Sequence, residues 1–107
     1  MAGQYKAMKL YDSELRILDI LWEKGGTSAK QLAEILREQG QWSKTTTYTV
    51  IKKCIDKGVV SREEPNFICC ALLTKREAQQ METDELINKM FNGEPDQLVA
   101  FVLHNKA

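Results

Sequence analysis

Hydroxyl and cationic side chains gather in one short stretch, WSKTTTYTVIKKCIDKG, which runs from Trp42 to Gly58. Threonine hydroxyls can bond base edges or phosphates, and a threonine methyl group can contact the methyl group of thymine. Lysine side chains neutralise phosphates and release counterions. Threonine and tyrosine favour strands, yet Ser43 opens the stretch as a helix cap would and Gly58 closes it as a helix terminator would. The residues therefore predict a helix whose surface could contact a nucleic acid.

The predicted helix runs from Ser43 to Lys57, and a plot at 100° per residue separates two different faces. One face is typical of a core and carries Thr47, Val50, Ile51, Cys54 and Ile55. The opposite face carries Thr45, Tyr48, Thr49, Lys52 and Asp56, with Lys44 and Lys53 on the flanks. Thr46 lies near the edge as a local N-terminal bond former. A merely solvated face would more often carry Glu, Lys and Gln, so the composition favours recognition of DNA.

The remaining reactive side chains do not form a recognisable catalytic or metal site. Cys54 lies on the apolar face of the predicted helix, and the adjacent Cys69 and Cys70 would point to opposite sides of a strand. His104 has no second ligand beside it. The chain has no glycine-rich phosphate loop, nucleophile elbow or HExxH motif. We therefore expect no enzyme activity, no metal and no cofactor.

Length and composition predict one small soluble protein. The chain has 107 residues, of which 43% are hydrophobic and 28% charged. No apolar run could cross a membrane, and the N-terminus lacks a secretory signal, so we expect a cytoplasmic location without membrane contact. Residues 1–62 carry a net charge of +4 and residues 63–107 a net charge of −4. The basic half is consistent with contact to a polyanion, although chance segregation explains the charge pattern equally well.

The elements that would position the predicted helix can be read from periodicity and caps. LYDSELRILDILWEKGG has apolar residues at helical spacing, and Gly25 and Gly26 end it. TSAKQLAEILREQG has a second apolar stripe, a capping box of Ser28 with Gln31, and Gly40 as its terminator. After Gly58, VVSREEPNFICCALL predicts a hairpin.

Two more helices are predicted towards the C-terminus. Thr74 and Glu77 are typical of a capping box, and Pro95 is typical of a helix start. The order of three helices and a hairpin predicts a winged helix-turn-helix in residues 10–73, in a mainly α fold. Residues 1–9 are expected to be flexible, and residues 74–107 to form a separate helical region.

The chain resembles the penicillinase repressor family of winged-helix transcriptional regulators, the BlaI/MecI type, with copper-responsive (CopY-type) repressors as relatives. The resemblance lies in SELRILDILWEKG, SAKQLAEIL and WSKTTTYTVIKKCIDKG. The last segment matches the family pattern at Trp42, Ser43, Thr46, Thr49, Lys53, Lys57 and Gly58. The match is strong from Asp12 to Gly58 and looser towards the C-terminus.

The resemblance implies a homodimeric repressor that binds an inverted-repeat operator in double-stranded DNA, with half-sites of the TACA/TGTA type and the third helix in the major groove. We expect DNA contacts from Ser43, Lys44, Thr45, Thr46, Tyr48, Thr49, Lys52, Lys53 and Arg62. The resemblance also places the dimer interface in the C-terminal helices. The apolar residues of these helices that we expect in the interface are Met81, Leu86, Ile87, Met90, Phe91, Leu98, Val99, Val102 and Leu103. Packing of that stripe on the chain's own core is the alternative.

The chain departs from the family pattern in several places. The wing keeps one aromatic residue, Phe67, and its turn is acidic at Glu63 and Glu64, which leaves Arg62 as the best phosphate contact. The copper-binding CxC pairs are absent, and DQLVAFVLHNKA lacks the Asn-Phe bond at which penicillinase repressors are cleaved. Similar proteins continue beyond the position of Ala107, so we expect a shorter or truncated chain. A winged helix used only for protein–protein association remains the alternative function.

Overall fold

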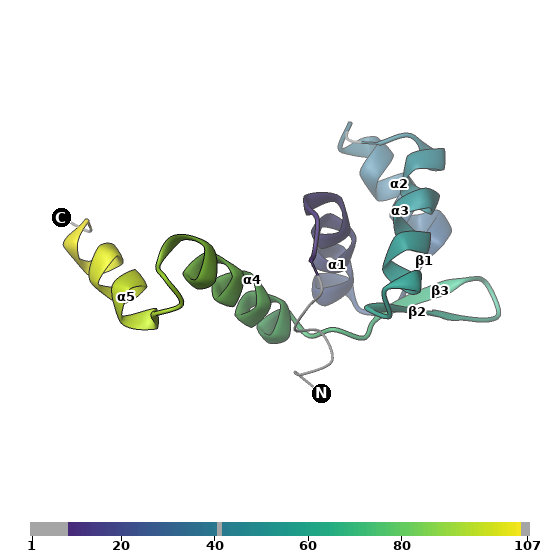
Figure 1. Cartoon of the computed structure of the whole chain (residues 1–107). Helices are drawn as coiled ribbons and strands as arrows, with labels where there is room; N and C mark the ends of the chain where they lie inside the picture. Colours follow the sequence, from purple (N-terminus) through teal and green to yellow (C-terminus); the bar gives the residue numbers. More distant parts are fainter. Residues whose placement is uncertain (1–8, 41, 106–107) are drawn as a thin grey trace. The chain divides into compact units, whose positions relative to one another are not determined.

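The computed structural model describes residues 9–40 and 42–105, which form two compact units (Figure 1). The first unit spans Lys9–Lys75, and the second contains the described residues from Arg76 onward. The first holds α1 (Asp12–Lys24), β1 (Thr27–Ser28), α2 (Ala29–Glu38), α3 (Lys44–Asp56), β2 (Val60–Glu63) and β3 (Ile68–Ala71). Then follow α4 (Lys75–Met90) and α5 (Pro95–His104). The predicted mainly α fold with a winged helix is confirmed; the flexible segment predicted over residues 1–9 lies, except for Lys9, outside the described residues.

Local sequence signals explain where several of the helices begin or end. Gly25 ends α1 with a φ of 79°, a backbone conformation that favours glycine. The predicted capping box opens α2: the Ser28 Oγ accepts the Gln31 N–H at 3.1 Å, and the Gln31 Oε1 accepts the Ser28 N–H at 3.2 Å. Pro95 occupies the first turn of α5, as predicted. Short-range sequence signals therefore fix these boundaries.

The sheet has three strands, whereas the sequence predicted only a hairpin. β3 pairs antiparallel with β2 on one side and with β1 on the other, where Thr27 lies opposite Cys69. A two-residue strand is too short to show an alternating pattern, which is why β1 was missed. A Cβ added at Gly26 would lie 3.2 Å from the Cys70 Sγ, so a glycine allows the close approach of β3 to this turn.

The core of the first unit joins α1, α2, α3 and the sheet. Its largest fully buried apolar side chains are Ile17, Leu18, Leu32, Leu36, Ile51 and Leu73. The inward face predicted for the third helix is confirmed, because Thr47, Val50, Ile51 and Cys54 are buried and Ile55 is half-buried. The Trp22 indole N–H donates to the Leu73 carbonyl at 2.9 Å, which attaches α1 to the end of the wing.

The three cysteines differ in accessibility, which gives a testable prediction. Cys54 and Cys69 are fully buried, and burial raises the pKa of Cys54 to about 12 and that of Cys69 to about 11. Cys70 is only half-buried. We expect a maleimide at pH 8 to label Cys70 alone in the folded protein and all three thiols in urea, as counted by mass spectrometry. Rapid labelling of three thiols without urea would contradict this packing.

In the second unit most apolar side chains remain accessible. Among the residues predicted for dimerisation, Ile87 is buried, Met81, Phe91 and Leu98 are half-buried, and the rest are exposed, namely Leu86, Met90, Val99, Val102 and Leu103. Ile87 is therefore already covered in the single chain and leaves little surface for a partner. Phe101, which the prediction did not include, lies 5.6 Å from Phe91, ring centre to ring centre. No helix in the described ranges is long and apolar enough to span a membrane.

Candidate nucleic-acid interface

α3 begins after Ser43, as the sequence predicted, because side chains cap its first turn. The Ser43 Oγ accepts the Thr46 N–H at 3.2 Å and donates to the Thr46 Oγ1 at 3.0 Å. The Thr47 hydroxyl donates to the Ser43 carbonyl at 3.2 Å and lies fully buried. These bonds offset the low helix propensity of a threonine run. The predicted roles of Thr46 as a local bond former and of Thr47 as a core residue are confirmed.

The outward face of α3 is polar and largely open to solvent. Its exposed members are Ser43, Lys44, Thr45, Thr46, Thr49, Lys52, Lys53 and, at the C-terminal end, Asp56. The Thr49 hydroxyl donates to the Thr45 carbonyl at 3.0 Å, so its oxygen is left to accept a hydrogen bond from a base amino group. Lys52 and Lys53 follow one turn later and are suited to phosphates. One helix face thus combines groups that can read bases with groups that can bind the DNA backbone.

Tyr48 departs from the sequence prediction, which placed it as an exposed residue. Its side chain is half-buried, and its ring meets Phe67 of the wing edge to face at a centroid distance of 6.0 Å. The Lys44 ammonium lies 6.0 Å from the same ring. A contact between residues 19 positions apart in the sequence could not be read from helical periodicity. Tyr48 therefore connects α3 to the wing, with part of its surface still accessible.

Phe67 is the residue through which the wing is attached to both α2 and α3. It has a φ of 51°, in the left-handed region that bulky side chains rarely adopt. Its carbonyl accepts the Ala29 N–H at the start of α2 at 3.0 Å, and its own N–H donates to the Glu64 Oε1 at 3.3 Å. These bonds, together with the Tyr48 contact, hold the strained backbone in place. The wing turn is thereby fixed next to the start of α2 and next to Tyr48 in the second turn of α3.

Arg62, the wing cation selected from the sequence, carries a partner within its own turn. Its Nε donates to the Glu64 Oε2 at 2.5 Å, and its guanidinium carbon lies 3.8 Å from the centre of the Phe67 ring. The hydrogen bond from Arg62 lowers the pKa of the Glu64 carboxyl, and the Phe67 N–H adds to this effect. Both charged side chains are about half exposed. Glu64, one of the two acidic residues noted in this turn, therefore pairs directly with Arg62.

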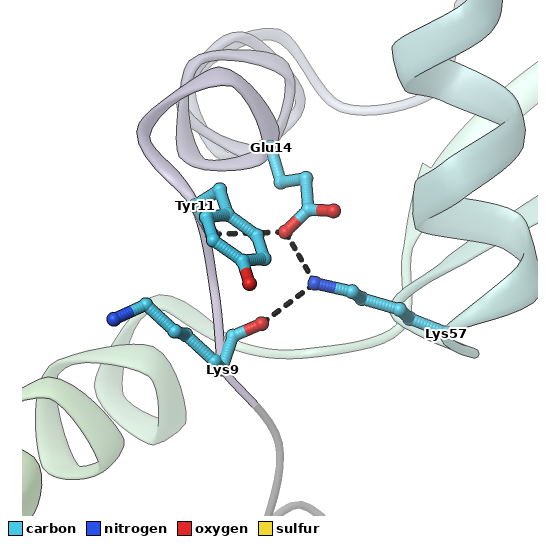
Figure 2. Close-up of polar contacts among 4 residues, drawn as sticks. All are labelled: Lys9, Tyr11, Glu14 and Lys57. Carbon is cyan, nitrogen blue, oxygen red and sulfur yellow. Dashed lines mark hydrogen bonds and ion pairs between the residues drawn. The ribbon is translucent and has the colours of Figure 1, made fainter.

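A partly buried ion pair connects the end of α3 to the start of α1 (Figure 2). The Lys57 Nζ lies 2.6 Å from the Glu14 Oε1 and 2.6 Å from the Lys9 carbonyl oxygen. The same Glu14 oxygen accepts the Tyr11 N–H at 2.9 Å, and the Lys57 ammonium lies 4.7 Å from the centre of the Tyr11 ring. Glu14 is only 1% exposed. Glu14 lies in the first turn of α1, where an acidic residue is common, so the local sequence does not indicate this link.

Comparison with known proteins gives the family. The model of the penicillinase repressor family matches residues 10–107. The chain belongs to this family. It is 27% identical over 96 residues to the methicillin resistance regulatory protein MecI of Mammaliicoccus sciuri, and the same figures hold for MecI of Staphylococcus aureus strain N315 and of Staphylococcus epidermidis. The match covers 88% of this chain and 78% of each relative.

The family, the winged helix and the polar face of α3 agree on a general function. The penicillinase repressor is a DNA-binding transcriptional repressor, and the family match extends through all the described residues except Lys9. The resemblance inferred from the sequence is confirmed. Within the described residues no group of three or more His, Cys, Asp or Glu side chains is placed to hold a metal ion.

Proposed function

We propose that the repressor binds an inverted-repeat operator as a homodimer, with α3 of each copy in the major groove. The observation that carries the proposal is the outward face of α3, where exposed threonine hydroxyls lie beside exposed lysines. Thr45 and Thr49 would face bases, while Ser43, Thr46, Lys44, Lys52 and Lys53 would bind phosphates. Arg62 would add a wing contact. The accessible apolar face of α5 supports a dimer, because such a face is normally covered in solution.

The test is a fluorescence anisotropy titration on a duplex with inverted TACA/TGTA half-sites, with a scrambled duplex as the reference. We expect tighter binding to the inverted repeat and a stoichiometry of two chains per duplex. Similar affinity for both duplexes would contradict specific recognition. Absence of binding to either duplex in low salt would contradict the whole proposal and favour a protein–protein role.

A phosphate contact by Lys52 predicts a change in salt dependence. We expect Lys52→Ala to weaken binding to both duplexes by similar factors and to reduce the slope of log K against log salt by about 1 per lost contact. Lys53→Ala should behave in the same way. The matched control is Lys89→Ala, an exposed lysine of α4, which should leave the slope unchanged. An unchanged slope for both Lys52→Ala and Lys53→Ala would contradict the assigned contacts.

A further inference from the structure

The wing turn holds a cation that is already paired with an anion of the same turn. The Arg62 Nε and the Glu64 Oε2 lie 2.5 Å apart, and Phe67 covers one side of the guanidinium at 3.8 Å. Their side chains are 52% and 58% exposed, respectively. The neighbouring Glu63 is also exposed. The turn therefore presents a net negative charge, although it contains the arginine best suited to reach DNA.

We propose that Glu64 determines the affinity of the wing for DNA. Its carboxylate binds the Arg62 guanidinium where a DNA phosphate would bind, so the phosphate must displace the carboxylate when DNA binds. The inference rests on the proposed function, in which Arg62 is the wing contact to DNA. Glu64 would thus be a built-in competitor that keeps the wing contribution small in this repressor.

The chemistry of the pair supports an exchange. A guanidinium binds carboxylate and phosphate oxygens through the same planar set of N–H donors. The pair is open to solvent, and exposed ion pairs hold their partners only weakly, so a phosphate can displace the carboxylate without a large cost. Arg62 does not depend on Glu64 for its place, because its guanidinium also stacks on Phe67.

The position of Phe67 explains why the exchange would affect DNA binding in particular. Its ring contacts Tyr48 of α3 at 6.0 Å, and its carbonyl is bonded to the Ala29 N–H of α2. The aromatic surface on which Arg62 stacks is therefore fixed to the helix that carries the proposed recognition face. A guanidinium released from Glu64 would remain next to that helix instead of moving freely in solvent.

The test compares Glu64→Gln with Glu63→Gln. Glutamine at position 64 keeps an oxygen that can accept the Phe67 N–H, which the Glu64 Oε1 accepts in the native turn, but it removes the charge that holds Arg62. Glu63→Gln removes an equal charge from the same turn without touching the Arg62 pair. We expect Glu64→Gln to tighten binding to the inverted repeat about two- to five-fold beyond the Glu63→Gln variant. Its salt slope should steepen by up to about 0.9 for each wing of the dimer that gains a phosphate.

A double-mutant cycle separates the effect of releasing Arg62 from the effect of weaker charge repulsion between the turn and DNA. In an Arg62→Ala background the excess gain of Glu64→Gln over Glu63→Gln should disappear. Equal effects of the two glutamine variants, a persistent excess without Arg62, or weaker binding by Glu64→Gln would each overturn the inference. Circular dichroism and a urea titration of each variant check that the fold is kept. If the wild-type protein and Lys52→Ala behave as proposed while Glu64→Gln does not, only the inference about Glu64 fails.

Discussion

Lys57→Met is expected to lower the free energy of unfolding of the winged-helix unit by about 2–4 kcal/mol, because it leaves the buried Glu14 carboxylate without its cationic partner. The Glu14 side chain is 2% exposed and that of Lys57 is 25% exposed, so water compensates only part of the lost interaction. Methionine keeps an unbranched chain that can still pack on Tyr11. Urea titration at a fixed protein concentration measures the change. Fluorescence reports on this unit, since the chain's two tryptophans, Trp22 and Trp42, both belong to it.

Two further variants show whether the charge itself is responsible. Lys53→Met removes an exposed lysine from the same helix and should change stability by no more than about 0.5 kcal/mol. Adding Glu14→Gln to Lys57→Met should recover more than half of the loss, because the amide keeps an acceptor for the Tyr11 N–H and carries no charge. A double variant as unstable as Lys57→Met alone would show that the buried charge is not the cause.

The ion pair also bears on DNA binding, because it fixes the C-terminal end of α3 to the N-terminal end of α1. In Figure 2 the Lys57 ammonium lies between the Glu14 carboxylate and the Lys9 carbonyl, at the opposite end of α3 from Ser43. Lys57→Met should therefore weaken operator binding without changing the salt slope, in contrast to Lys52→Ala. The slope distinguishes a residue that holds α3 in place from one that contacts phosphate.

Val102→Glu is expected to convert the proposed dimer into a monomer at micromolar concentration. Val102 is 52% exposed and lies on one side of α5 together with Leu98, Val99 and Leu103, and no residue of α5 is buried in the single chain. In a two-fold interface one substitution occurs twice. Loss of two buried valine contacts corresponds to about 3–6 kcal/mol, or a factor on the order of 10² to 10⁴ in the dimerisation constant. Light scattering measures the mass directly.

His104→Glu is the matched control for this substitution. His104 is also exposed on α5, but it lies about 160° around the helix from Val102. It should leave the mass unchanged, whereas Val102→Glu should also weaken operator binding, because a monomer can use only one half-site. A monomeric wild-type protein, or a Val102→Glu protein that stays dimeric, would contradict an interface on this face of α5.

The sequence predicted those features that depend only on residues a few positions apart. The caps at Ser28 and Ser43, the inward face of α3 and the hairpin were all predicted, because each is encoded by local spacing. The division of the threonines on α3 followed from the same periodicity. Family resemblance added the general function. Neither source tests which outward residues read bases, so that assignment stays a prediction.

Contacts between distant segments were missed for a common physical reason. Glu14 and Lys57 are 43 positions apart, and nothing in their local sequence marks them as partners. Glu14 fits the expected pattern of an acid in a first helical turn, which hides its second role. Likewise, Tyr48 was placed on the exposed face because a helical plot contains no information about the wing. Pairings of this kind arise only when the helices and the sheet pack together.

The strand order has a consequence for how the chain reaches this structure. β3 is the last strand in the sequence but lies between the other two, so neither β1 nor β2 has a neighbour until residues 68–71 have been synthesised (Figure 1). Joining β1 to β3 closes a loop of about 40 residues, an entropic cost that must precede the gain from pairing. The contacts of Phe67 with α2 and α3 depend on the same late segment. Folding of α3 into its final place therefore awaits a part of the chain that is made after it.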